Sequence, residues 1–266
     1  MQLTKSFNSV LPADVLERYE WRETRNASAV LNSTNPEAFK EVVDVIRDFE
    51  LTSGMLLLPG RNESLVPQYL NDSFRTLGWR EARVDSSIRN TLVVFPYSGA
   101  GESSVRRIDS EIVEFEGYKA DWVKRTESGD RGIAGDTEWN AKDGNLDRNV
   151  ASYRALYEAG FIDGAILITR TQEDLRKLEL ELINEFDQAT DSHAATTLRT
   201  TTDVVLEVRQ RLAKLREKGQ NVSRLGTSTT TNLPKLEQRM KRGDGGGCPI
   251  LSIGISRATW DGRAFH

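Results

Sequence analysis

The sequence predicts an α/β domain in which helices flank a central mixed β-sheet. Residues 165–168 are entirely apolar and residues 249–255 are mostly so, as expected of strands that are covered on both faces. Segments with apolar residues at helical spacing alternate with these strands along the chain. No repeat of fixed period is visible, so the sequence predicts neither a solenoid nor a propeller.

The first half of the chain predicts two helices followed by strands. Asn35 and Pro36 supply an N-cap and a first-turn proline for one helix. A second helix is expected over residues 67–77, ended by Gly78. Alternating side chains then predict three strands, over residues 112–116, 118–123 and 133–140.

The second half predicts further helices around the two apolar strands. Asp147 is expected to cap a helix that stops at Gly160, just before the first of these strands. Thr171 and Asp174 resemble a capping box that opens the next helix. A later stripe suits packing on another helix, within the chain or in a dimer, and consists of Val205, Val208, Leu212 and Leu215.

The domain organisation follows from length and charge. The 266 residues are predicted to form a single domain over 1–266, with 171–247 as a helical insertion before the last core strand. Residues 199–242 carry eleven Lys or Arg against four Asp or Glu, a charge of +7, although the whole chain is −4. This asymmetry indicates a basic, phosphate-facing surface on the insertion, although a solvated helix face would give the same count.

Composition excludes several classes of protein. Charged residues make up 29% of the chain and the mean hydropathy is −0.51, so no membrane-embedded protein is expected. The single cysteine, Cys248, excludes a disulfide framework and a multi-cysteine zinc site. The N-terminal segment lacks the pattern of an export signal, and we therefore expect a soluble, cytoplasmic protein.

A constellation of polar residues on the predicted strands points to chemistry. Glu138, Asn140 and, if the strand continues, Lys142 would project from one face, since residues two apart share a face. If this strand pairs with the one that holds Asp121, two carboxylates meet at one edge of the sheet. Carboxylate oxygens, waters and a phosphate oxygen form the shell that Mg²⁺ prefers. Asp136 shares the face of Glu138 and is an alternative ligand to Asp121.

At this point the sequence resembles the BglII/BstYI-type restriction endonucleases of the PD-(D/E)XK nuclease superfamily. The resemblance depends on the segments 121–124 (Asp-Trp-Val-Lys) and 138–140 (Glu-Trp-Asn). Residues 78–81, the helix and strand over 147–170, and the closing strand over 248–255 add to it. It covers residues 63–170 and the C-terminal strand.

The resemblance implies a restriction-endonuclease-like fold and a type II restriction endonuclease that hydrolyses phosphodiester bonds in double-stranded DNA at a short palindromic site. Asp121 and Glu138 would bind Mg²⁺, and Asn140 would take the third catalytic position, where the superfamily usually has Lys and this branch has Gln. The chain departs from the pattern in the shorter amide of Asn140 and in the longer spacing between the two acids. That spacing implies an extra loop over 127–135. Family members usually act as homodimers, because two-fold symmetry matches a palindromic site.

Other readings of these residues remain open. Asp121 and Glu138 could be ordinary surface acids, and Lys142 could be a surface lysine or fill the third position. Candidate DNA contacts are basic residues near the N-terminus and in the insertion, namely Arg22, Arg25, Arg224, Arg239, Lys241 and Arg242. Alternatives to the restriction enzyme are a repair or recombination nuclease and a DNA-binding protein whose nuclease site has decayed.

Overall fold

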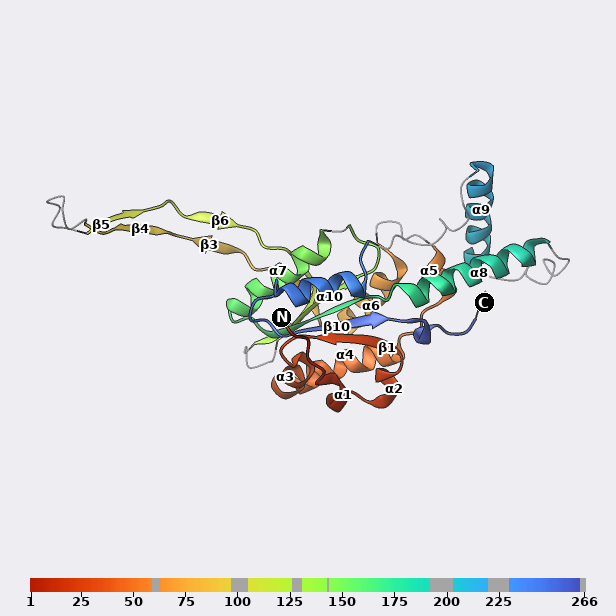
Figure 1. Cartoon of the computed structure of the whole chain (residues 1–266), viewed down its shortest axis with the longest axis horizontal. Coiled ribbons are helices and arrows are strands. Elements are labelled where there is room, and N and C mark those ends of the chain that lie inside the picture. Colours follow the sequence, from red (N-terminus) through yellow and green to blue (C-terminus); the bar gives the residue numbers. More distant parts are fainter. Residues whose placement is uncertain are drawn as a thin grey trace.

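Strands from both ends of the chain build the central sheet of the computed structural model (Figure 1). The structure describes residues 1–58, 63–96, 105–125, 131–142, 144–191, 203–219 and 230–263. Within these ranges the sheet has six strands in the order β1-β10-β9-β8-β7-β2. Their bounds are β1 Tyr19–Glu23, β2 Arg80–Ala82, β7 Ala120–Arg125, β8 Gly132–Glu138, β9 Ile162–Arg170 and β10 Ile250–Ile255.

The sheet is mixed. Strand β9 pairs in parallel with β8 and β10, whereas β1, β7 and β2 join by antiparallel pairing. The three central strands are buried along almost their whole length, as the apolar composition of β9 and β10 predicts; β8 is equally buried although it ends in Asp136, Thr137 and Glu138. Parallel pairing requires long crossovers, and α7 connects β8 to β9. The predicted α/β class with a mixed, helix-flanked sheet is confirmed.

Helices cover both faces of the sheet. On one face, α7 (Asn145–Glu158) and α10 (Leu233–Arg242) pack on the central strands. On the other lie α3 (Ala27–Thr34), α4 (Pro36–Asp48) and α6 (Leu65–Thr76). The remaining helical elements are α1 Phe7–Val10, α2 Ala13–Leu16, α5 Ser53–Leu57, α8 Glu173–Asp191, α9 Asp203–Glu217 and the 3₁₀ turn Arg257–Thr259.

The described part of 171–247 is helical and joins β9 to β10. Helix α10 covers the sheet, while α8 and α9 extend away from it (Figure 1). On α9, Val208 and Leu212 are buried in the core of the same chain, so this part of the apolar stripe packs within the chain. No helix in the described ranges is both long enough and apolar enough to cross a membrane.

Asn35 occupies the N-cap position predicted for it, with Pro36 as the first residue of α4, but its side chain accepts no capping hydrogen bond. Its side-chain amide nitrogen donates to Asp163 Oδ2 at 2.8 Å. Helix α7 begins at Asn145, so Asp147 lies in its first turn, and its carboxylate accepts hydrogen bonds from Arg239. The prediction that Asp147 caps α7 is therefore wrong, because its carboxylate pairs with Arg239 of another helix and lies inside the helix it was expected to cap.

A long two-stranded ribbon leaves the sheet between β2 and β7 (Figure 1). It is built from β3 Ser86–Ile88 with β6 Val113–Phe115, and from β4 Thr91–Val94 with β5 Arg106–Asp109. The strand predicted over 112–116 therefore lies in this ribbon and outside the central sheet.

Candidate active site

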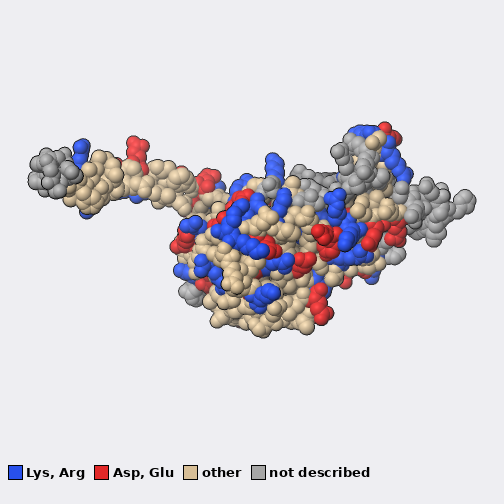
Figure 2. All heavy atoms as spheres, in the orientation of Figure 1, with Lys and Arg blue, Asp and Glu red and all other residues tan. Residues whose placement is uncertain are grey.

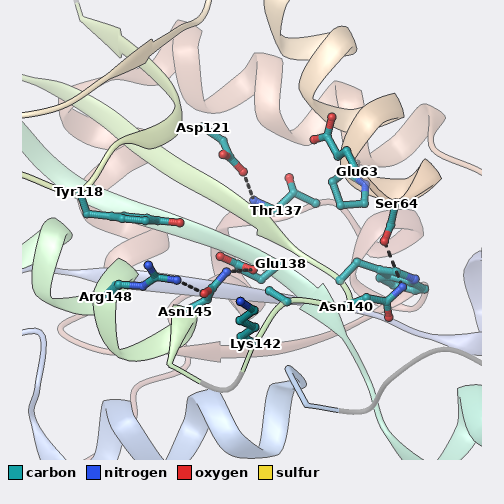
Figure 3. Close-up of a pocket in the computed structure, with 13 residues that line it drawn as sticks. Glu63, Ser64, Tyr118, Asp121, Thr137, Glu138, Asn140, Lys142, Asn145 and Arg148 are labelled. Atoms are coloured by element: carbon teal, nitrogen blue, oxygen red, sulfur yellow. Dashed lines mark hydrogen bonds between the residues drawn. The ribbon is translucent and has the colours of Figure 1, made fainter. Parts of the chain in front are cut away.

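A pocket of about 480 Å³ opens at the end of β8 (Figure 3). Glu63 and Ser64, which precede α6, form one wall, and Asp121 of β7 forms another. Thr137 and Glu138 line it from the end of β8. The first turns of α7 complete the lining with Asn145 and Arg148. Four separate segments thus converge on one cavity, and both Asp121 and Glu138 line it.

Side-chain hydrogen bonds fix Asp121 where β7 and β8 separate. The backbone ladder runs from Arg125 opposite Gly132 to Trp122 opposite Gly135. Beyond it, the N–H of Thr137 donates to Asp121 Oδ2 at 3.1 Å, and the N–H of Asp121 donates to Asp136 Oδ1 at 3.1 Å. Carboxylates thus replace backbone carbonyls as acceptors, which satisfies these amides and orients Asp121 at the pocket.

Helix α7 holds Glu138 from the opposite side. Asn149 is buried and donates from Nδ2 to Glu138 Oε1 at 2.9 Å. One turn earlier, Asn145 approaches Glu138 Oε2 at 3.5 Å, a weaker contact. Spacing of four residues places both amides on one face of the helix. Glu138 is only 6% exposed, so these donors orient a carboxylate that solvent barely reaches.

The acids of the site oppose one another's ionisation. Burial raises the pKa of Asp121, the Thr137 N–H opposes that rise, and nearby Glu63 adds to it. Burial likewise raises the pKa of Glu138, with Asp121 adding to the rise and Asn149 opposing it. The repulsion between such neighbouring carboxylates is reduced when a cation binds between them.

Asp136 has a different environment from the two pocket acids. It is 1% exposed, does not line the pocket, and accepts a 2.5 Å hydrogen bond from the hydroxyl of Tyr153 on α7. Burial, with the charge of Asp121, raises its pKa well above the usual range for an aspartate. The geometry therefore favours Asp121 over Asp136 as the partner of Glu138.

Asn140 and Lys142 both line the pocket, although the strand does not extend to them. The expectation that β8 continues to residue 140 is wrong: its ladder with β7 ends at Gly135 and its pairing with β9 ends at Glu138, while Asp121 accepts the intervening N–H of Thr137. Asn140 follows in a bend and donates from Nδ2 to Ser64 Oγ at 3.1 Å. Figure 3 shows Asn140 directed at Ser64, and Lys142 on the side of Glu138 and Asn145.

Sequence reasoning missed the contribution of α7. Arg148 brings a guanidinium to the pocket, where it donates to Asn145 Oδ1 and lies 5.1 Å from the centre of the Tyr118 ring. The spacing of Asn145, Arg148 and Asn149 places them on one helical face, which was a usable signal. The sequence does not show, however, that this face of α7 points toward Glu138, because that depends on how α7 packs on the sheet.

The described basic residues predicted to meet DNA lie outside the pocket lining, and each has an acceptor within the chain. Arg239 is almost buried and forms a two-point ion pair with Asp147 at 2.8 and 2.7 Å. The other pairs are Arg22 with Glu237 and Glu20, Arg25 with the Gly246 carbonyl, Lys241 with Glu237, and Arg242 with Asp147 and Asp244. Arg224 is outside the described residues.

Three other acids on or beside strands, Glu81, Glu114 and Glu116, lie outside the pocket lining. Glu114 and Glu116 lie in or beside the exposed β6 of the ribbon, and Glu116 pairs with Arg83. Glu81 pairs with Lys119 and Arg75 at the surface, which lowers its pKa. Cys248 is a buried thiol whose pKa is raised by burial.

The chemistry of the pocket fits a hard divalent cation. No three His, Cys, Asp or Glu side chains of the described residues gather as a metal cluster. Mg²⁺ needs no such cluster, because it binds through one or two carboxylates and completes its shell with water and substrate oxygens. Thr137 Oγ1, which is buried beside the pocket, has no hydrogen-bond partner in the described structure, so a bound water could satisfy it.

Comparison with known proteins identifies the family. No curated protein gives a significant match. The sequence profile of the family described as restriction endonuclease BglII/BglIII matches residues 19–255, which includes every strand of the central sheet. The resemblance inferred from the segments around Asp121 and Glu138 is therefore confirmed, and this chain belongs to the restriction endonuclease BglII/BglIII family.

Proposed function

We propose that this chain is a Mg²⁺-dependent type II restriction endonuclease that hydrolyses phosphodiester bonds in double-stranded DNA at a short palindromic site. The observation that carries the proposal is the meeting of Asp121 and Glu138, from two adjacent strands, in one pocket. Membership of a restriction endonuclease family supports the reaction class. We also propose that the enzyme acts in the cytoplasm, as expected from its sequence.

Asp121 and Glu138 hold the cation in this proposal. When bound, Mg²⁺ would activate water and offset the charge that develops on the leaving oxygen. The protein contributes orientation, because Asp121 is fixed by the Thr137 N–H and Glu138 by Asn149. Both acids must be ionised to bind the cation. Burial favours their neutral form, and these hydrogen-bond donors counteract it by stabilising the carboxylates.

Asn140 and Lys142 take different roles. An amide cannot remove a proton near neutral pH, so Asn140 can only orient water or phosphate. Lys142 carries a charge that complements a phosphate in the same pocket. We therefore propose Asn140, which donates to Ser64, for the third catalytic position as an orienting group, with Lys142 as the alternative.

Among the basic residues proposed to meet DNA, exposure separates two groups. Lys241 and Arg242 are more than half exposed at their side chains and can exchange their intrachain partners for phosphates. Arg239 instead fastens α10 to α7 through Asp147. Arg22, Arg25 and Arg224 remain predicted contacts. A homodimer would present two such pockets to the two strands of a palindromic site.

Cleavage of DNA of known sequence tests the proposal. Plasmid and phage DNA are incubated with the protein in Mg²⁺ or in EDTA, and discrete fragments are expected with Mg²⁺ only. Glu138→Gln is expected to lower the rate at least about 1,000-fold while DNA retardation persists. Glu114→Gln, an exposed acid of the ribbon, is the matched control and should cut normally.

Other outcomes would point elsewhere. Nicking that depends on DNA structure rather than on sequence would indicate a repair or recombination nuclease instead of a restriction endonuclease. Retardation without cleavage would indicate a decayed site. Unchanged cutting by Glu138→Gln would remove this residue from the active site.

A further inference from the structure

Arg148 is a cation of the pocket that has no part in the chemistry described so far. It lies near the start of α7, lines the cavity and is exposed. Figure 2 shows basic and acidic side chains interleaved over the body of the molecule. Further along α7, Arg154 follows this pattern and pairs with Glu158 at 2.7 Å. Arg148 differs, because no acidic side chain of the described residues forms an ion pair with it.

Two neighbours hold the guanidinium of Arg148 at the pocket. Its Nη2 donates to Asn145 Oδ1, and its guanidinium carbon lies 5.1 Å from the centre of the Tyr118 ring. Figure 3 shows Arg148 between these two side chains. The ring is the broader support, because Asn145 accepts from only one of the five N–H donors of a guanidinium. The other donors remain for an acceptor in the cavity.

Tyr118 stays neutral beside the charges of the site. Burial raises the pKa of Tyr118 to about 12, and the charges of Glu138 and Asp136 add to the rise. Its ring therefore offers a neutral face to the guanidinium near neutral pH. Ser152 donates from Oγ to the carbonyl of Tyr118 at 3.3 Å, so the helix that carries Arg148 also holds the ring.

The charge of the pocket lining leaves room for one phosphodiester group. The described lining contains three acids and two bases, namely Glu63, Asp121, Glu138, Lys142 and Arg148. With all of them ionised its formal charge is −1, and Mg²⁺ in the proposed site would make it +1. A phosphodiester carries a single negative charge, which would balance the remainder. Without Arg148 the loaded pocket would be neutral before the phosphate entered.

The chemistry of a guanidinium suits this phosphate. Its planar N–H groups match two oxygens of one phosphate group, and it stays charged at any pH at which proteins fold. Asn140, proposed for the third catalytic position, is a neutral amide and brings no charge to the phosphate. Arg148 reaches the same cavity from another element and can supply that charge.

We infer that Arg148 is a catalytic residue that donates hydrogen bonds to the non-bridging oxygens of the scissile phosphate. The inference rests on the proposed function and adds the group that binds the reacting phosphate. In hydrolysis the oxygen of water bonds to phosphorus, the bond from phosphorus to one bridging oxygen breaks, and a proton of the water passes to the released oxygen. A guanidinium that is already in place stabilises the negative charge of the phosphoryl oxygens during this step.

Cleavage by Arg148→Gln, with Arg154→Gln as the matched control on the same helix, tests the inference. We expect Arg148→Gln to lower the single-turnover rate at saturating Mg²⁺ about 100-fold or more, and Arg154→Gln to cut at the wild-type rate. The half-saturating Mg²⁺ concentration should stay nearly unchanged in both, because neither side chain binds the metal. Both arginines are exposed, so thermal unfolding should match that of the wild type.

The salt dependence of DNA binding gives a readout without cleavage. Each variant is combined with Glu138→Gln and titrated with duplex DNA in EDTA, because this substitution makes the described lining neutral without metal. One phosphate contact contributes about 0.9 to the slope of log K against log salt concentration. The slope should fall by this amount with Arg148→Gln and stay unchanged with Arg154→Gln.

Two results would overturn the inference: wild-type cutting by Arg148→Gln, or a slower variant with an unchanged salt slope. The second result would mean that Arg148 acts through Glu138 and does not touch the phosphate. If the wild type binds DNA without cutting it, while Arg148→Gln still lowers the slope, the proposed function fails and the phosphate contact stands.

Discussion

Replacing Asn149 with leucine removes the amide that donates to Glu138 at 2.9 Å while roughly keeping the side-chain volume. Asn149 Oδ1 has no partner in the described structure, so the substitution sacrifices only the donated bond. A hydrogen bond to a charged acceptor contributes about 1.5–3 kcal/mol. Losing a residue that orients a metal ligand weakens metal binding about 10–100-fold. The two estimates agree, because a 10–100-fold change in affinity corresponds to about 1.4–2.7 kcal/mol.

The assay is the Mg²⁺ dependence of DNA cleavage. The half-saturating Mg²⁺ concentration of Asn149→Leu should rise about 10–100-fold. The pKa of Glu138 should rise further, since Asn149 opposes the effect of burial, so activity should shift to higher pH. Asn145→Ala is the control, because its 3.5 Å contact is weak and its effect should stay within about threefold. If Asn149→Leu keeps the wild-type Mg²⁺ and pH profiles while remaining folded in EDTA, Glu138 is not held in the way described.

Three further predictions concern stability and reactivity. Gly135→Ala should destabilise the protein by about 3 kcal/mol or more in urea unfolding, because the added Cβ would lie 2.0 Å from the Trp122 ring. Gly144→Ala is the control and should have little effect, because no atom lies near the added Cβ. Equal losses of stability in the two variants would contradict this packing. Arg239→Ala should cost about 1 kcal/mol at pH 7. Because Arg239 lowers the pKa of folded Asp147, that stability is present above the unfolded pKa and is lost as the pH falls through the folded pKa. The difference between variant and wild type should therefore shrink as the pH falls below the unfolded pKa of Asp147 and vanish below its lowered folded pKa, and a constant difference would refute the ion pair as its cause. Cys248 should resist thiol reagents until the protein unfolds, because burial raises its pKa; rapid modification of the native protein would show that the thiol is accessible.

Local patterns determined much of the fold. The apolar run at 165–168 and the closing segment at 249–255 became the adjacent buried strands β9 and β10 because strands covered on both faces must be apolar throughout. Helix α4 begins at Pro36, as expected of a residue with a fixed φ and no N–H. Asp121 and Glu138 were also predicted together, and the pocket contains both.

Only the tertiary structure decided which acids face the pocket and where β8 ends. Periodicity places Asp136 and Glu138 on one face but does not distinguish them; Tyr153 buries the first, and Asn149 holds the second at the cavity. The ladder between β7 and β8 ends at Gly135, where a carboxylate of β7 takes the N–H of Thr137, and β8 continues to Glu138 only by pairing with β9. These outcomes depend on contacts between elements brought together by folding, and a single-chain pattern records spacing along the backbone without the neighbour that each side chain meets.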